Sequence, residues 1–324
     1  MANSFNEWEG PLIELEEGIS KLREVIKREP DALKRASLEK RAEEFESRRD
    51  RYIDLMYARL SPWEKVLVSR APKRPYTLDY INNCFSDFVE LQGDRKFGAD
   101  HAIVGGLAKL DGNTIVVLGH QKGRTIQERQ LRNFGYARPE GYRKAIRLFE
   151  MAERFRLPVI TFIDTPGADA GVEAESRGIS EAIADSMLKM FELTVPSISV
   201  IIGEGGSGGA IGIACASKVM ILEHSVYSVI APEGCASILW RMPERGADAA
   251  KALQLTAQAA KEYGLVDEII SEPVGGAHRD PSEAAALVRQ NILAQLEPLS
   301  KMGAEELKVS RYEKFRAMGR FSEK

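Results

Sequence analysis

Short apolar runs alternate with amphipathic stretches along most of the chain. Runs rich in β-branched and aliphatic residues predict buried strands over residues 103–107, 114–119, 157–163, 198–202, 218–223 and 225–230. Apolar residues at helical spacing predict helices over residues 139–155, 179–191, 231–240, 247–263, 281–296 and 304–318. Strands that come singly or in pairs, each set followed by a helix, predict an α/β fold with a twisted sheet.

The first 60 residues have a different pattern, typical of a charged helical arm, and Pro30 divides it into two predicted helices. The first has apolar residues three or four positions apart, at Leu12, Leu15, Ile19, Leu22 and Ile26. The second has a thin apolar seam seven positions apart, at Leu38, Phe45 and Tyr52. A seam this sparse is more typical of a solvated helix docked on a larger body than of a coiled coil. We therefore expect an arm that helps to hold a partner subunit.

A segment rich in proline and basic residues, 71–75, follows the arm and a short helix that Ser61-Pro62-Trp63 is expected to cap. We place the domain boundary there, with the arm in residues 1–72 and the α/β domain and its C-terminal helices in residues 73–324. Within that domain, the Asp111-Gly112 pair between two apolar runs predicts a β-hairpin.

Charged side chains gather near two of the predicted strand ends. Residues 129–138 predict a basic loop, which either contacts phosphates or a partner's acidic surface or is simply solvated. The pattern leaves open whether Lys122 and Arg124, just before it, contact a ligand or the protein itself. Asp164 ends a buried strand and either stabilises a local turn or marks a pocket that the following backbone lines.

The composition excludes several classes of protein. The 324 residues are 44% hydrophobic and 29% charged, with a net charge of −3, which allows one large core plus an appendage and does not favour generic nucleic-acid binding. No apolar run reaches the ~18–20 residues that span a membrane, and we expect no signal peptide. Cys84, Cys215 and Cys235 are scattered and the histidines lie far apart, so we expect neither disulfides nor a metal site, and a cytoplasmic location.

The densest glycine run in the chain, residues 203–209, follows the predicted strand at 198–202 and precedes a predicted helix of small apolar residues over 210–216. This order leaves first-turn backbone N–H groups free, and such groups favour a negative charge. A P-loop is excluded, because Ala210 and Ile211 stand where it requires a Lys-Ser or Lys-Thr pair. Three interpretations remain: a nucleophile elbow at Ser207, an oxyanion hole of main-chain amides, and a turn that merely allows close strand–helix packing.

Nine strings of residues, in one consistent order, carry a resemblance to a known family. They are Pro75-Tyr-Thr-Leu-Asp-Tyr80, Gly93-Asp-Arg95, Ala102-Ile-Val-Gly-Gly106, Gly119-His-Gln-Lys-Gly-Arg124, Pro139-Glu-Gly-Tyr-Arg-Lys-Ala145, Thr161-Phe-Ile-Asp-Thr-Pro-Gly-Ala168, Gly203-Glu-Gly-Gly-Ser-Gly-Gly-Ala210, Pro232-Glu-Gly-Cys-Ala-Ser-Ile-Leu-Trp240 and Gly275-Gly-Ala-His-Arg279. Residues 75–279 therefore resemble the α subunits of the carboxyltransferase component of multi-subunit acetyl-CoA carboxylase, and the helical arm and tail are similar as well.

The resemblance implies a crotonase-type fold, in which repeated β-β-α units build two sheets that cross at a steep angle. It implies an α2β2 enzyme, whose active site lies between α and β, and which works with a biotin carboxyl carrier protein and biotin carboxylase. Such an enzyme transfers a carboxyl group from carboxybiotin to acetyl-CoA, which gives malonyl-CoA for fatty acid synthesis. No cofactor is then bound covalently to this chain, and zinc is expected on the β subunit alone.

The resemblance also implies site residues. The N–H groups of Gly208 and Gly209 are expected to hold the charge that develops on the biotin ureido oxygen, while the β subunit supplies the donors for acetyl-CoA. No side-chain base is expected, because the released biotin nitrogen takes the proton. Further pocket residues are expected from three segments, namely Gly205, Gly206, Ser207 and Ala210, then Pro166, Gly167 and Ala168, then Glu233 and Gly234.

One position departs from the family's pattern, since Asp169-Ala170-Gly171 stands where the family usually has Tyr-Pro-Gly. This departure leaves the pocket wall and the acyl preference open. Three other functions also remain open. They are a serine hydrolase in which a histidine such as His224 activates Ser207, a non-catalytic assembly subunit, and a free-standing hydratase or isomerase of the crotonase type.

Overall fold

Eight strands form one mixed sheet in the computed structural model, which describes residues 9–319. They are β1 (Ser86–Glu90), β2 (Ile103–Leu110), β3 (Asn113–His120), β4 (Val159–Thr165), β5 (Ser197–Gly206), β6 (Lys218–Leu222), β7 (Val226–Ser228) and β8 (Glu268–Ile270). Their order is β1-β2-β3-β4-β5-β6-β8, with β7 paired to β5 off this path. The pairs β1–β2 and β2–β3 are antiparallel, and the others are parallel.

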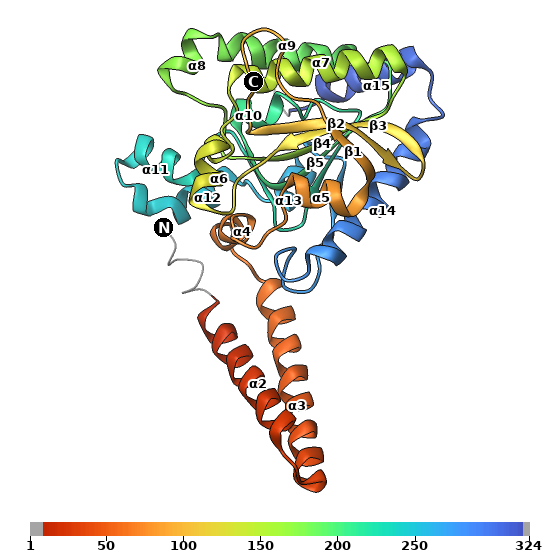
Figure 1. The fold of residues 1–324 in the computed structure, drawn as a ribbon. Helices are drawn as coiled ribbons and strands as arrows, with labels where there is room; N and C mark the ends of the chain where they lie inside the picture. The colour runs from red at the N-terminus through yellow and green to blue at the C-terminus, as the bar shows by residue number, and fades with distance from the viewer. Residues whose placement is uncertain (1–8, 320–324) are drawn as a thin grey trace.

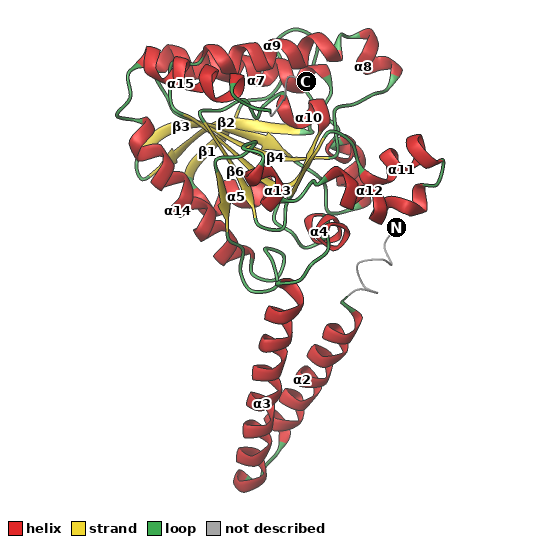
Figure 2. Ribbon diagram, turned by 180° about the vertical axis from the view of Figure 1, so that it is seen from behind, coloured by secondary structure: helices red, strands yellow, loops and turns green. Residues whose placement is uncertain are grey.

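Helices cover both faces of the sheet (Figures 1 and 2). Their bounds are α4 (Pro62–Ser69), α5 (Thr77–Cys84), α6 (Ile126–Leu131), η1 (Asn133–Gly135), α7 (Pro139–Phe155), α8 (Val172–Ser176), α9 (Ile179–Glu192), α10 (Ser207–Ile211), α11 (Pro232–Trp240), η2 (Pro243–Arg245), α12 (Gly246–Leu253), α13 (Ala257–Glu262), α14 (Pro281–Leu299) and α15 (Ala304–Arg316). Buried residues of α7 and α9 form a core on one face, and those of α5 and α14 form a second core on the other.

The central strand β4 shows why the sheet is buried on both sides. Ile160 and Phe162 lie in the core under α5 and α14, whereas Val159 and Ile163 lie in the core under α7 and α9. Side chains of a strand alternate between its faces, so an uninterrupted apolar run fills two cores at once. The predicted buried strand at 157–163 is thus confirmed.

The hairpin predicted at Asp111-Gly112 is confirmed as well. Leu110 pairs with Asn113 across the turn. Asp111 and Gly112 have φ angles of 49° and 81°, the left-handed backbone that a two-residue type I′ turn requires.

The sheet branches at β5. Residues 198–201 of this strand pair with β6, and residues 204–206 continue past it and pair with β7. The α/β class is therefore confirmed. Within residues 9–319 the strands form one sheet that branches at β5, where two crossed sheets were expected. Residues 203–206, predicted to form part of a turn, are the last residues of the strand.

The N-terminal arm is a hairpin of two helices, α2 (Gly10–Arg28) and α3 (Ala32–Tyr57), which projects from the body (Figure 1). The seam predicted in the second helix is wrong at Tyr52, which is 41% exposed, whereas Leu38 and Phe45 are half-buried; Ala42, Ile53 and Tyr57 are the buried residues of this helix. Since α2 lies along α3, the contact stripe follows the 3.6-residue helical period rather than a seven-residue repeat.

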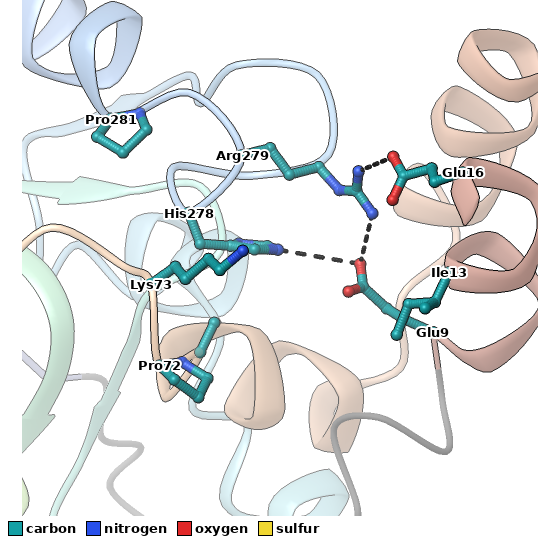
Figure 3. A pocket seen from close by; sticks show the side chains of 9 residues that line it. Glu9, Ile13, Glu16, Pro72, Lys73, His278, Arg279 and Pro281 are labelled. Atoms are coloured by element: carbon teal, nitrogen blue, oxygen red, sulfur yellow. Dashed lines mark hydrogen bonds and ion pairs between the residues drawn. The ribbon is translucent and has the colours of Figure 1, made fainter. Parts of the chain in front are cut away.

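Charged contacts join the base of the arm to the body (Figure 3). The Arg279 guanidinium lies 2.6 Å from Glu16 and 3.4 Å from Glu9, and the Tyr57 hydroxyl donates to Glu9 at 2.5 Å. His278 and Lys73 face the same cavity, which has a volume of ≈ 590 Å³. The arm is thus fixed at its base, while most of its length contacts no other part of residues 9–319.

The segment predicted as a boundary, residues 71–75, is packed into the body. Arg74 is 1% exposed and donates to the Ile202 carbonyl, the Ser225 hydroxyl and the Glu272 carboxylate. Arg74 and Glu272 form a buried ion pair at 2.6 Å. The division at residue 73 stays a prediction, but the segment is no free linker.

Other predicted elements differ in extent. The predicted basic loop at 129–138 includes the end of α6 and the whole of η1, and the helix predicted at 247–263 is interrupted at Gln254, which has a φ of 50°. The helix predicted over 210–216 is wrong, because α10 ends at Ile211. The Ser186 hydroxyl binds the Gly212 carbonyl, and the Thr161 hydroxyl binds the Ile213 carbonyl, so tertiary partners take the acceptors that a longer helix would use.

Candidate functional site

The glycine turn, residues 203–209, lies where β5 ends and α10 begins. The chain reverses at Ser207, whose φ of 49° is left-handed and therefore costly for any residue other than glycine. Because β5 is central and buried in both cores, the turn is held rigidly at the carboxyl end of parallel strands. Sites of open α/β sheets lie at this edge.

Two glycines of the turn contact the backbone of the loop after β4. A Cβ on Gly206 would lie 2.2 Å from the Pro166 carbonyl oxygen, and one on Gly209 would lie 2.5 Å from the Gly167 carbonyl carbon. On the other side, a Cβ on Gly205 would lie 2.8 Å from the Tyr227 ring. These approaches leave no room for a side chain, so the close-packing interpretation holds for these three positions.

Gly208 differs from its neighbours. A Cβ there would meet only the Ile183 methyl, at an ordinary 3.5 Å. Its backbone is partly exposed, whereas Gly209 is buried. Among residues 9–319, the N–H groups of Gly208 and Gly209 have no hydrogen-bond acceptor outside their own helix, and first-turn amides have none inside it. The carbonyl of Gly209 accepts from the Tyr142 hydroxyl at 3.2 Å, which fixes the orientation of that peptide.

An apolar cavity of ≈ 310 Å³ opens beside Gly208. Its lining consists of Ser207, Gly208, Ile211, Tyr227, Ser228, Val229 and Leu265. A cavity with mainly apolar walls, two serines and the open backbone at Gly208 favours a flat, weakly polar group.

A chain of five alternating charges lies behind the glycine turn. We call it the ion-pair chain, and it consists of Asp164, Lys122, Glu204, Arg70 and Glu233. The Lys122 ammonium lies 2.7 Å from Asp164 and 2.8 Å from Glu204. Arg70 lies 2.7 Å from Glu204 and 2.5 Å from Glu233. The ion-pair chain thus joins the ends of β3, β4 and β5 to α4 and α11.

Two members of the ion-pair chain, Glu204 and Lys122, are held in their charged forms by their neighbours. Burial raises the pKa of Glu204, but Lys122 and Arg70 outweigh burial and lower it to about 2. Burial lowers the pKa of Lys122, but Asp164 and Glu204 outweigh it and hold the pKa above its ordinary value. Glu204 and Lys122 therefore both stay charged at neutral pH.

The residues expected in the pocket divide between two cavities, and Ser207 and Gly208 line the one of ≈ 310 Å³. Pro166, Gly205 and Gly206 line a cavity of ≈ 20 Å³ together with Arg70 and Glu204, and Gly167 and Ala168 pack on Gly209. Three expected residues lie elsewhere. Ala210 is buried in the core, Glu233 pairs with Arg70, and Gly234 packs beside Ile230.

Ser207 has the backbone of a nucleophile elbow but no triad. Its side chain has no hydrogen bond to any histidine within residues 9–319. The His224 ring packs 5.5 Å from the ring of Tyr57, and its backbone N–H donates to Glu272. His120 is fully buried, and burial together with Lys122 lowers its pKa to about 3. Neither histidine is placed to activate Ser207.

Lys122 and Arg124, whose contacts the sequence leaves open, both contact protein. Arg124 donates to Asp79 at 2.5 Å, and its guanidinium lies 4.8 Å from the Tyr76 ring centroid. The unusual Asp169 is also engaged, since it accepts from Asn133 at 3.1 Å and pairs with Arg138 at 3.4 Å. It thereby fixes the loop after β4 to η1 and the start of α7.

Sequence reasoning missed Arg70 and Glu204 as parts of the site. Glu204 carried a usable signal, because it is the one charged residue in the apolar and glycine-rich stretch 195–216. Arg70 carried none, since an arginine at the end of a short surface helix is ordinary and its partners are 134 and 163 positions away.

No three or more His, Cys, Asp or Glu side chains within residues 9–319 gather closely enough to hold a metal ion. In the same part of the chain, no helix combines the length and the apolar character that crossing a bilayer requires.

The chain is similar to known proteins over its whole length. Residues 5–319 match the family model of acetyl co-enzyme A carboxylase carboxyltransferase-like proteins. The acetyl-coenzyme A carboxylase carboxyl transferase subunit alpha of Geobacter metallireducens is 51% identical over 324 residues, which cover 100% of both chains. That of Fusobacterium nucleatum is 50% identical over 316 residues, which cover 98% of this chain and 99% of the relative.

Two solved structures show the same fold at low identity. A transcarboxylase 12S structure aligns with a TM-score of 0.57 and 21% identity, over 70% of this chain and 42% of the other. A Pseudomonas malonate decarboxylase hetero-tetramer in complex with coenzyme A aligns with a TM-score of 0.59 and 15% identity, over 72% of this chain and 91% of the other.

Proposed function

This chain belongs to the acetyl co-enzyme A carboxylase carboxyltransferase family, and from this premise we propose that it is the α subunit of an acetyl-CoA carboxylase carboxyltransferase. It transfers the carboxyl group of carboxybiotin to acetyl-CoA and so forms malonyl-CoA, which commits acetyl units to fatty acid synthesis. The support is the agreement of the whole chain with relatives that carry this name.

The observation that carries the proposed site is the open backbone at Gly208. Carboxyl transfer leaves negative charge on the ureido oxygen of biotin, and preorganised donors in a dry pocket stabilise such a charge best. The N–H groups of Gly208 and Gly209 are unpaired donors, and the apolar cavity beside Gly208 suits the flat bicyclic ring. The chain itself then binds, orients and stabilises, and the released biotin nitrogen takes the proton.

A β subunit completes the site in this proposal. Apolar side chains surround the cavity, and Val229, Ile238 and Leu239 are 74%, 73% and 64% exposed. Covering them with a partner buries apolar surface and excludes water from the reacting groups. The partner supplies the acetyl-CoA site and the zinc, in an α2β2 assembly in the cytoplasm that receives carboxybiotin from a biotin carboxyl carrier protein and biotin carboxylase.

The test compares two neighbouring substitutions in the purified α–β complex. Gly208→Val places a branched side chain in front of the donors, and we expect malonyl-CoA formation to fall by about 10²–10³-fold, the usual cost of losing an oxyanion donor. Ser207→Ala removes a hydroxyl from the same turn and should leave the rate within about twofold. Co-elution of the two subunits on size-exclusion chromatography checks that each complex assembles.

The alternatives predict other results. A serine hydrolase loses nearly all activity in Ser207→Ala. A non-catalytic assembly subunit keeps full activity in Gly208→Val as long as the complex forms. A free-standing hydratase or isomerase acts on enoyl-CoA without the β subunit, so assaying this chain alone on enoyl-CoA addresses that case.

A further inference from the structure

Charged contacts hold the end of β5 in addition to the packing around the strand. Glu204 lies two residues before Gly206 and three before the reversal at Ser207. Its backbone N–H donates to Asp164 at 3.0 Å, and its carboxylate is shared by Lys122 and Arg70. Gly203 allows this approach, because a Cβ there would lie 2.4 Å from the Asp164 carboxylate.

The first three charges of the ion-pair chain, from Asp164 to Glu204, are well shielded from water. The side chains of Asp164, Glu204 and Lys122 are 3%, 12% and 15% exposed. Buried ion pairs add little net stability compared with apolar residues of the same volume, since desolvation offsets the attraction. What they do impose is geometry, because each carboxylate oxygen must stay within hydrogen-bond distance of its cation. The ion-pair chain is therefore suited to holding the end of β5 in one position.

The ion-pair chain also reaches distant elements. Arg70 follows α4, which follows the arm, and Glu233 lies in the first turn of α11, which carries the exposed Ile238 and Leu239. Arg70 contacts both Glu204 and Glu233. The backbone before the turn is thus tied to the helix that leads from the arm and to the helix beside the proposed β-subunit surface.

We propose that Lys122 and Glu204 are positioning residues for the reaction: the ion bridge between them sets the direction of the Gly208 and Gly209 N–H groups. This inference rests on the proposed function of those amides. Oxyanion donors need placement to within a few tenths of an ångström, and a misplacement of about 1 Å costs up to 10²-fold in rate. Neither side chain has to contact substrate for this effect.

Removing Lys122 alone has a distinctive electrostatic consequence. In Lys122→Met, the carboxylates of Asp164 and Glu204 remain close together without the cation between them. Arg70 still pairs with Glu204, and Arg74 and His120 are further titratable groups nearby. Two carboxylates that share a site repel, so the pKa of one rises and it takes up a proton as the pH falls. Protonation removes the repulsion. We therefore expect the activity of this variant to rise from pH 9 towards pH 6 relative to wild type, a readout that a merely structural role would not move.

The experiment uses the α–β complex with Lys122→Met, Glu204→Gln and Arg124→Gln. We expect the first two to lower kcat about tenfold or more at pH 8, with KM for malonyl-CoA in the reverse reaction within about twofold of wild type. Arg124 lies in the same loop as Lys122 and forms an exposed ion pair with Asp79 of α5. Arg124→Gln removes this pair and serves as the control, with kcat expected within about twofold of wild type.

Glu204→Gln keeps the size of the side chain, so it decides the matter even where Lys122→Met does not fold. A wild-type kcat in folded Glu204→Gln overturns the inference, as does a Lys122→Met variant whose kcat matches wild type between pH 6 and pH 9. The two proposals fail separately. If Gly208→Val is inactive and Glu204→Gln is fully active, the amides act without the bridge, whereas an active Gly208→Val overturns the role of the amides themselves.

Discussion

Gly206 and Gly208 lie two residues apart in one turn, yet just one of them has room for a side chain. A Cβ on Gly206 would lie 2.2 Å from a backbone oxygen, which cannot move without shifting the loop after β4. A Cβ on Gly208 would make an ordinary contact with a flexible methyl group. Gly206 is therefore required by packing, whereas packing does not require a glycine at position 208, where the proposed ligand contacts the backbone.

Alanine at the two positions separates these roles. We expect Gly206→Ala to lower the free energy of unfolding by about 1–3 kcal/mol or more, the usual cost of overpacking, and Gly208→Ala to change it by less than about 0.5 kcal/mol. Urea denaturation of both variants beside wild type measures the difference. Equal stability of the two variants would contradict the packing described here.

At the scale of the element, α10 is short because other elements bind the carbonyls just beyond its end. The Ser186 hydroxyl of α9 donates to the Gly212 carbonyl at 2.6 Å. We expect Ser186→Ala to lower the free energy of unfolding by about 1–3 kcal/mol, since a buried carbonyl loses its partner. The measurement is the denaturation midpoint, and Ser176→Ala on the exposed helix α8 is the control, since its hydroxyl bonds within its own turn. Equal midpoints for the two variants would mean that Ser186 does not terminate α10.

The end of α10 also shows which features of this fold a local sequence pattern can predict. β4 and the Asp111-Gly112 hairpin were predictable, because an apolar run and a two-residue turn are local signals. The end of α10 was not, because small apolar residues over 210–216 favour a helix locally and distant hydroxyls override that preference. The candidate site divides in the same way. The glycine turn is recognisable from the sequence because its glycines are consecutive or nearly so. The ion-pair chain joins positions 70, 122, 164, 204 and 233, and no local pattern indicates which of these charges form pairs.

At the scale of the whole molecule, the arm is fixed mainly at its base. Arg279 binds both Glu9 and Glu16 of the arm, and the Glu9 side chain is 5% exposed. Burial raises the pKa of Glu9, but His278, Tyr57 and Arg279 outweigh it and hold the pKa below its ordinary value, so Glu9 stays charged. Removing the arginine therefore leaves a buried carboxylate without its cation.

We expect Arg279→Gln to loosen the arm while the body keeps its stability. Amide hydrogen exchange in α2 should become about 5–100-fold faster, because losing the charged partner of a buried group costs about 1–3 kcal/mol of local stability. Exchange in β4 and β5 should not change. Arg289→Gln, which breaks the exposed pair with Asp111 on the body, is the control and should leave the arm unaffected. Unchanged exchange in α2 of Arg279→Gln would mean that apolar contacts alone hold the arm.

The backbone-on-backbone contact of Gly206 and Gly209 with the loop after β4 has a consequence for inhibition. A compound that binds the two proposed amide donors would make its main contacts with peptide groups, which no codon change can remove. The usual route to resistance, replacement of a contacting side chain, is narrow here, because the turn accepts almost no side chain at all. Escape would have to come from Gly208 or from the cavity wall at Val229 and Leu265, and a resistance screen should collect its mutations there.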